Sequence, residues 1–170
     1  MKLDRTYRAE AAHQLSAGVP EGHQCRRLHG HRYVIKVYIS GDTDPRTGML
    51  LEFADIDRRV KEVLDLVDHR FINELGYEAH IGTRAIGVPP VLVTSPINGA
   101  VIHETELAQK VRDNSTVENL IAWFVAELKH RFPRDTLKIG PLSLRPPALT
   151  AVEIEEDADS KVSLWVGEAP

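Results

Sequence analysis

Two stretches of alternating residue character near the start of the chain predict two β-strands. From Leu3 to Leu15 the odd positions are mostly apolar and the even positions mostly polar, with Arg5 as the exception. The odd positions of residues 29–39 form a second series of this kind. Alternation with a period of two is typical of a strand with one buried face. We expect the two strands to pair as an antiparallel hairpin around a loop at residues 16–25.

Apolar residues at helical spacing predict two helices further along the chain. The first helix is expected from about Ala54 to Glu74, and its apolar stripe contains Ile56, Val60, Val63, Leu64, Val67 and Phe71. The second helix is expected after Ser115, because Ser115-x-x-Glu118 has the pattern of a capping box. Its stripe contains Leu120, Phe124 and Leu128, with Ile121, Val125 and Phe132 beside it.

Two further strands complete a β-β-α-α-β-β order. They are marked by Val152 and Ile154, which alternate with Glu153 and Glu155, and then by Val162, Leu164 and Val166. This order predicts an α+β fold with two helices packed on one face of an antiparallel sheet. The segment at about 76–114, between the helices, indicates only a short helical turn around Glu104 to Val111. A connection of this length is unusual in a compact domain.

Composition narrows the class of protein. A chain of 170 residues fits a single domain, 1–170, that can bury its own core. The net charge of −4 gives no reason to expect nucleic acid or an anionic membrane as a partner. No apolar stretch approaches the roughly 20 residues that cross a bilayer, and Met1 to Arg5 lack the apolar core of a signal peptide. A single cysteine excludes an internal disulfide, so we expect a cytoplasmic protein.

Three histidines have the inward-facing parity of the first two strands. These are His13, His29 and His31, and pairing of the strands would bring their rings onto one surface. Three neutral imidazoles leave a coordination position open, as in a catalytic zinc site, although copper or nickel could bind them in vitro. The alternative is a buried trio that binds backbone carbonyls, which would be costly to desolvate without a metal. The pattern therefore predicts zinc.

Cys25 lies four residues before His29, and three interpretations of it stay open. As a fourth metal ligand it would close the site and make it structural. As a base beside the metal it would lose its proton more readily than a free thiol. As a small buried hydrophobic residue it would have no chemical role, but its neighbours in the loop are polar.

Other candidate groups come from later in the chain. Asp68 and His69 form an adjacent acid–base pair, but neighbours in a regular helix face different directions. To act together, the two residues need a distorted helix end or a partner from elsewhere. The alternative is that the pair is a surface feature at the end of the helix. Glu156 has the inward parity of its strand, where a carboxylate needs donors such as an amidine-like ring edge. Thr116 is interpreted as a helix-start residue, with a role in a pocket as the secondary possibility.

These residues fall in the order found in one enzyme family. The motifs are Ala11-Ala12-His13, Cys25-x-x-x-His29-Gly30-His31, Gly48-Met49-Leu50-x-Glu52-Phe53, Asp68-His69, Thr116-x-Glu118-Asn119-Leu120 and Ala151-Val152-x-Ile154-x-Glu156. The chain resembles the 6-pyruvoyl-tetrahydropterin synthase family, and within it the bacterial 6-carboxy-5,6,7,8-tetrahydropterin synthases. The resemblance spans about Leu3 to Val166, apart from an insertion at about 76–114.

The resemblance implies a tunnelling fold (T-fold), in which the sheets of several subunits join into a barrel. It implies a homohexamer, built as a dimer of trimers, with active sites between subunits. The implied activity is that of a zinc-dependent lyase that converts 7,8-dihydroneopterin triphosphate into 6-carboxy-5,6,7,8-tetrahydropterin, acetaldehyde and triphosphate. Such an enzyme serves tetrahydropterin biosynthesis and the queuosine and deazapurine pathways.

The resemblance also implies residue roles. His13, His29 and His31 would hold zinc, and Glu156 would anchor the pterin ring. Cys25 would exchange protons with the substrate side chain, and Asp68 with His69 would arrive from a neighbouring subunit as the complementary acid and base.

Two other functions stay open at this point. A related enzyme would make 6-pyruvoyl-tetrahydropterin or, by an aldolase-like cleavage, 6-hydroxymethyl-dihydropterin. Relatives that favour the latter cleavage tend to have Glu where Cys25 stands. A non-catalytic protein that binds a pterin or a metal would keep the three histidines and Glu156, but it would not need Cys25 or the Asp68–His69 pair.

Overall fold

The computed structural model describes residues 1–75, 77–82, 91–96, 106–132, 137–139 and 142–166. Its strands are β1 (Lys2–His13), β2 (His29–Ser40), β3 (Arg70–Phe71), β4 (Tyr77–Gly82), β5 (Val91–Pro96), β6 (Leu137–Ile139), β7 (Leu142–Leu144), β8 (Ala148–Asp157) and β9 (Ser160–Trp165). The α-helices are α1 (Phe53–Leu64), α2 (Glu106–Asp113) and α3 (Val117–Arg131), and the single-turn 3₁₀ helices are η1 (Gln24–Arg26) and η2 (Ile72–Glu74).

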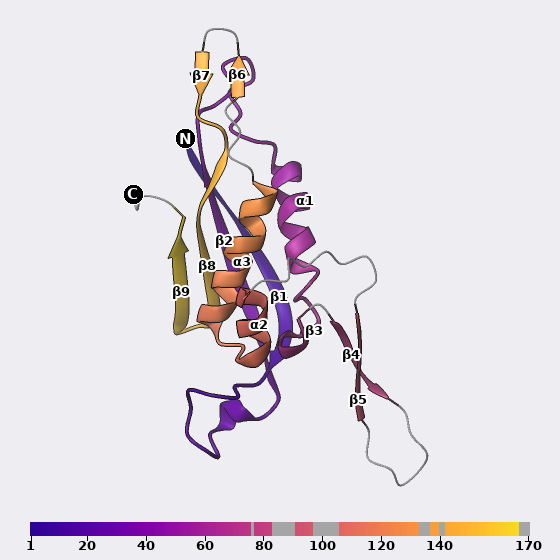
Figure 1. Ribbon diagram of the computed structural model, residues 1–170. Coiled ribbons are helices and arrows are strands. Elements are labelled where there is room, and N and C mark those ends of the chain that lie inside the picture. The colour runs from indigo at the N-terminus through magenta and orange to yellow at the C-terminus, as the bar shows by residue number, and fades with distance from the viewer. Residues whose placement is uncertain (76, 83–90, 97–105, 133–136, 140–141, 167–170) are drawn as a thin grey trace.

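A five-stranded sheet in the order β3-β1-β2-β8-β9 forms the body of the molecule (Figure 1). Strands β1 and β2 are antiparallel along their whole length, from Lys2 opposite Ser40 to His13 opposite His29. Strands β2, β8 and β9 continue the antiparallel pairing, whereas the short β3 lies parallel to β1. The hairpin and the two later strands predicted from the alternation are confirmed.

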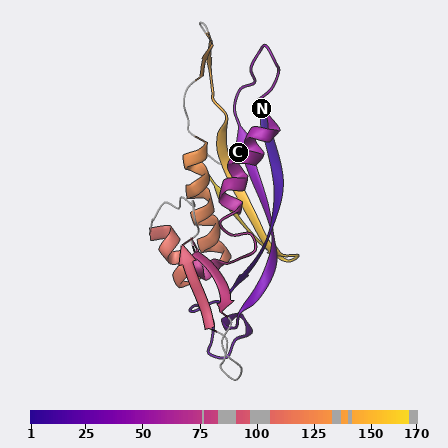
Figure 2. The same ribbon diagram turned by 90° about the vertical axis from the view of Figure 1, so that its right-hand side faces the viewer.

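Helices α1, α2 and α3 lie on the same side of this sheet (Figures 1 and 2). The predicted stripe of the first helix is buried at Ile56, Val60 and Val63. Helix α3 buries its predicted stripe and also Trp123 and Glu127, so it is enclosed on more than one side. Together with the inward side chains of the sheet these residues form one apolar core. The predicted α+β class is confirmed, and α2 lies on the same side of the sheet as the two predicted helices.

The first helix is shorter than predicted, because α1 ends at Leu64 rather than near Glu74. Val67 is still buried, so the apolar spacing continues beyond the end of the helix. His69 has a φ of 57°, a left-handed conformation that is incompatible with continued helix. Its backbone N–H donates to the carbonyl of Glu10 at 2.6 Å, so the chain turns there and runs beside β1.

The predicted capping box at Ser115 is also wrong. Helix α3 is capped by Thr116, whose hydroxyl accepts a hydrogen bond from the backbone N–H of Asn119 at 3.3 Å. Ser115 contacts the end of β1 instead, with its carbonyl on His13 and its hydroxyl on Gln14. The interpretation of Thr116 as a helix-start residue is confirmed.

Within the segment at about 76–114, the structure describes the antiparallel pair β4–β5 and the helix α2. Helix α2 corresponds to the short helical turn expected around Glu104 to Val111, and the rest of the segment lies outside the described residues. A second small pair, β6–β7, was not predicted. In the ranges that the structure describes, no helix is both long and apolar enough to cross a membrane.

Candidate functional site

Three imidazole rings converge where β1 ends and β2 begins. His13 and His29 are direct partners across the two strands, and His31 lies two residues further along the same face. The ring centroid of His13 lies 4.5 Å from that of His29 and 5.1 Å from that of His31. The centroids of His29 and His31 are 5.0 Å apart. One nitrogen of each ring lies within 4.8 Å of the others. The rings therefore meet, as the strand parity predicts.

Two of the rings are oriented by backbone carbonyls. The Nδ1 of His13 is 2.8 Å from the carbonyl oxygen of Ser115, and the Nδ1 of His29 is 2.8 Å from that of Arg27. A carbonyl can only accept, so each Nδ1 must hold the proton. In the neutral ring the lone pair is then on Nε2, the nitrogen turned away from the backbone.

The Nε2 of His13 is buried and has no hydrogen-bond partner among the described residues. Burial lowers the pKa of His13 to about 4. The hydrogen bond to Ser115 acts in the opposite direction, and the nearby His29 and His31 lower the pKa slightly further. The ring is therefore neutral near pH 7. A buried, unsatisfied lone pair is costly unless something binds it. Three neutral nitrogen donors around one point fit a divalent metal such as zinc, with a coordination position left open.

A cavity of about 890 Å³ extends from the histidines. The three rings line it together with Cys25, Thr116 and Glu156. Cys25 is half-buried and belongs to η1, and its carbonyl accepts a hydrogen bond from Leu15 N at 2.8 Å, which closes the intervening loop. The compact group of potential ligands contains the three histidines and not Cys25. This geometry favours a thiol that faces a ligand in the cavity over a thiol that seals the metal site.

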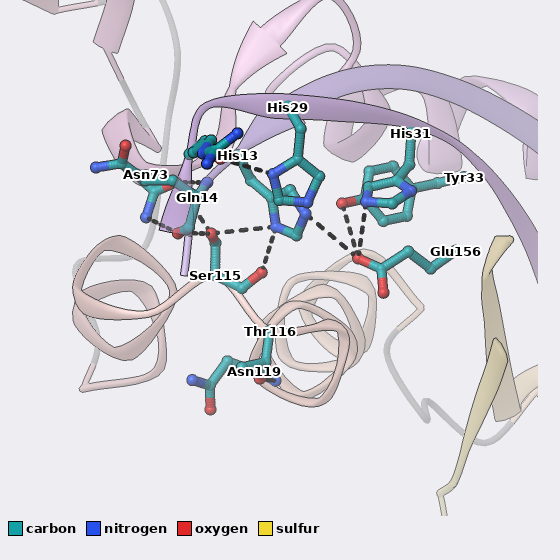
Figure 3. Close-up of polar contacts among 11 residues, drawn as sticks. His13, Gln14, His29, His31, Tyr33, Asn73, Ser115, Thr116, Asn119 and Glu156 are labelled. Carbon is teal, nitrogen blue, oxygen red and sulfur yellow. Dashed lines mark hydrogen bonds and ion pairs between the residues drawn. The ribbon is translucent and has the colours of Figure 1, made fainter. Parts of the chain in front are cut away.

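Glu156 points at the histidine cluster from β8 (Figure 3). Its Oε1 lies 3.5 Å from the Nε2 of His13 and 3.8 Å from the Nε2 of His31, and it accepts a hydrogen bond from the hydroxyl of Tyr33 at 3.3 Å. Burial and the nearby carboxylate raise the pKa of Tyr33, so the hydroxyl stays protonated and can donate. The inward parity of Glu156 is confirmed. Tyr33 was missed, although it has the same parity as His29 and His31.

Asp68 and His69 lie apart from this cavity. The Nδ1 of His69 is 3.1 Å from Asp68 Oδ1, which also accepts a hydrogen bond from Glu10 N at 2.8 Å. The side chain of His69 is 78% exposed. The pair is not among the described residues that line the cavity. The helix ends before Asp68, as a working pair requires, but one chain does not bring the pair to the histidines.

Comparison with known proteins supports the motif order. A family model described as 6-pyruvoyl tetrahydropterin synthase matches residues 2–166. The 6-carboxy-5,6,7,8-tetrahydropterin synthase of Haemophilus influenzae is 38% identical over 77 residues, which cover 42% of this chain and 51% of that protein. The protein of the same name from Synechocystis is 43% identical over 79 residues, which cover 41% and 57%. The chain spans about half the length of the curated relatives it matches.

The fold is also found among solved structures. The structure of 6-pyruvoyl tetrahydropterin synthase from Caenorhabditis elegans matches with a TM-score of 0.62 at 23% identity, over 98% of this chain and 96% of that one. This likeness confirms the T-fold of the single chain, whereas the barrel across subunits stays a prediction. Because the family model covers almost all of the sequence, the chain belongs to the 6-pyruvoyl tetrahydropterin synthase family.

Proposed function

We propose that the protein is a zinc-dependent 6-carboxy-5,6,7,8-tetrahydropterin synthase that acts on 7,8-dihydroneopterin triphosphate. The observation that supports this most directly is the cluster of His13, His29 and His31, which lines a cavity together with Cys25 and Glu156. The bacterial relatives with this name support the choice of product, and the substrate is the one that the family resemblance implies.

The three histidines would hold the zinc, which when bound polarises a side-chain hydroxyl or ketone oxygen of the substrate. Cys25 would then remove and return a proton at the neighbouring carbon, with Sγ as the proton-bearing atom. Glu156 would accept hydrogen bonds from the N–H edge of the pterin ring. Tyr33 would hold Oε1 of Glu156 in place, so that the direction of the carboxylate is set before the ring enters.

We further propose that Asp68 and His69 act in the site of a neighbouring copy. Their exposure and their absence from the described lining of the cavity of their own chain support this arrangement. The charges of the cavity support it as well. The described residues that line the cavity include one lysine, Lys161, and several carboxylates. These carboxylates belong to Glu118, Glu156, Asp157 and Asp159. A triphosphate would need cations from outside this set, and a second copy that completes the site is one source of them.

The direct test is to incubate the purified, zinc-loaded protein with 7,8-dihydroneopterin triphosphate and to identify the products by mass. Acetaldehyde with 6-carboxy-tetrahydropterin is the expected result. A product that keeps the three-carbon side chain would indicate a 6-pyruvoyl-tetrahydropterin synthase, and a hydroxymethyl product would indicate an aldolase. Tight binding of the pterin without turnover would overturn the enzymatic function and indicate a binding protein.

A further inference from the structure

Behind His13, on the side away from the cavity, lies a small polar network that the proposed chemistry does not use. It joins the end of β1, the single turn η2 and the link between α2 and α3 (Figure 3). We propose that Asn73 and Ser115 are positioning residues that fix the tautomer and the direction of the His13 ring before any metal binds. This inference rests on the proposed metal site.

The contact between Ser115 and His13 sets the position of the proton. The carbonyl oxygen of Ser115 is 2.8 Å from His13 Nδ1, and the hydroxyl oxygen of the same residue is 3.3 Å from that nitrogen. Both His13 and Ser115 are buried, so water does not compete for the ring. With the proton held on Nδ1, the Nε2 lone pair faces His29 and His31 as a metal ligand must.

Asn73 fixes the position of the backbone next to His13, because it binds both backbone polar groups of Gln14. Its Oδ1 accepts from the backbone N–H of Gln14 at 2.9 Å, and its Nδ2 donates to the carbonyl of Gln14 at 3.0 Å. This pairing determines which end of the carboxamide is oxygen, because an N–H can only donate and a carbonyl can only accept. The Ser115 hydroxyl lies 3.0 Å from the same Oδ1 and 3.1 Å from the Gln14 carbonyl, and both oxygens are acceptors for its single proton.

Both residues that determine the position of the His13 ring, Gln14 and Ser115, are therefore bound to the side-chain carboxamide of Asn73. Gln14 is the next residue after His13 in the chain, and Ser115 binds the ring itself. Asn73 Nδ2 also lies 3.4 Å from the carbonyl of Arg112 in α2. Replacement of Nδ2 by oxygen in Asn73→Asp would set an acceptor against the Gln14 carbonyl and weaken this fastening, while the size of the side chain stays the same.

Asn119 offers a matched control. Its carboxamide also donates to backbone carbonyls, at 2.7 Å to Asn114 in the α2–α3 link and at 3.4 Å to Lys110 in α2. The hydrogen bonds of that side chain do not include His13, Gln14 or Ser115. Asn119→Asp therefore changes the same atom in the same part of the fold, without changing a side-chain contact of His13, Gln14 or Asn73.

The test uses the whole chain of 170 residues and cobalt or zinc alone. Competition with a chelator should show Asn73→Asp binding zinc about tenfold or more weakly, as loss of support behind a metal ligand generally does. Asn119→Asp should stay within about twofold of the wild type, because the hydrogen bonds of this side chain go to Asn114 and Lys110 and not to a metal ligand. The visible spectrum of the cobalt form should change in Asn73→Asp and not in the control. Unchanged affinity and spectrum in Asn73→Asp would overturn the proposal.

Two further measurements cover the case in which Asn73→Asp does not fold. In the metal-free wild type, nitrogen NMR of His13 should show the proton on Nδ1, and a proton on Nε2 would overturn the proposal. Ser115→Ala keeps the carbonyl but removes the hydroxyl, and it should also weaken zinc binding. If the wild type binds neither metal, the proposed metal site fails, while the NMR result still decides the orientation of the ring.

Discussion

The histidine cluster and the Asp68–His69 pair contain similar groups in opposite surroundings. In the cluster, the ring of His13 is buried and lies against two further imidazoles that line a cavity with it. In the pair, the ring of His69 is 78% exposed and contacts the neighbouring carboxylate. Both regions are fastened to β1, the cluster at its end and the pair three residues earlier at Glu10.

The difference indicates which parts of the proposed site one chain can build by itself. In the cluster, carbonyls orient two of the three rings and all three potential ligand atoms come from one chain, so one chain could hold a metal there. The pair is held in a left-handed turn at His69, a conformation that costs on the order of 1 kcal/mol and is often kept at functional sites. An ordered but outward-facing acid–base pair fits a group that serves another copy.

Removal of a ring from the cluster should have the largest effect. His13→Ala deletes a buried ligand, so we expect the zinc content to fall and turnover to drop by at least about a thousandfold, because metal stabilisation of charge contributes several kcal/mol. Metal analysis and steady-state kinetics measure both effects. The control is His69→Ala, which should bind zinc like the wild type. Full zinc content in His13→Ala would contradict the three-histidine site.

Cys25→Ala tests whether the thiol belongs to the chemistry or to the metal. Loss of a general base should lower turnover by on the order of a hundredfold or more. The zinc content should stay the same, since the compact ligand group consists of the three histidines. A variant that loses both zinc and activity would show that Cys25 is a ligand, and the role proposed for it would be wrong.

Mixed assemblies test whether the pair acts across a subunit boundary. His69→Ala alone should lose about a hundredfold in turnover, at the lower end of the range for an acid or base. Assemblies made by co-refolding His69→Ala with Cys25→Ala should regain about a quarter of the wild-type activity, because half of the chains supply each intact group at a shared boundary.

The control for this experiment is a mixture of the two variants that have been folded separately and kept from exchanging subunits. It should stay as inactive as its components. A wild-type protein that is monomeric at working concentration, or mixed assemblies that form and stay inactive, would place the action of His69 elsewhere.

The sequence was sufficient for the cluster because a strand has a period of two. Once the parity of β1 and β2 is known, the faces of His13, His29 and His31 follow, and so does that of Glu156 in β8. The loop between the two strands then predicts that they pair as an antiparallel hairpin. The same parity would also have indicated Tyr33, had its hydroxyl been considered as a partner for the carboxylate.

The sequence was not sufficient for the supports of the cluster. Ser115 and His13 are separated by 102 residues, and Ser115 and Asn73 by 42, so their contacts depend on how helices and sheet pack. The early end of α1 was missed because residues 65–70 contain neither glycine nor proline. The apolar spacing continues through Val67, and the turn is set by a tertiary hydrogen bond to Glu10.

The smallest expected effect concerns the residue that links the cluster to α3. The hydroxyl of Thr116 caps the helix directly after Ser115, the residue whose carbonyl orients His13. Thr116→Ala should lower the free energy of unfolding by about 1 kcal/mol, the usual cost of a lost N-cap. Thr116→Ser, which keeps the hydroxyl, should unfold close to the wild type in urea. If both variants were equally destabilised, the methyl group rather than the cap would matter, and the start of α3 would depend on packing.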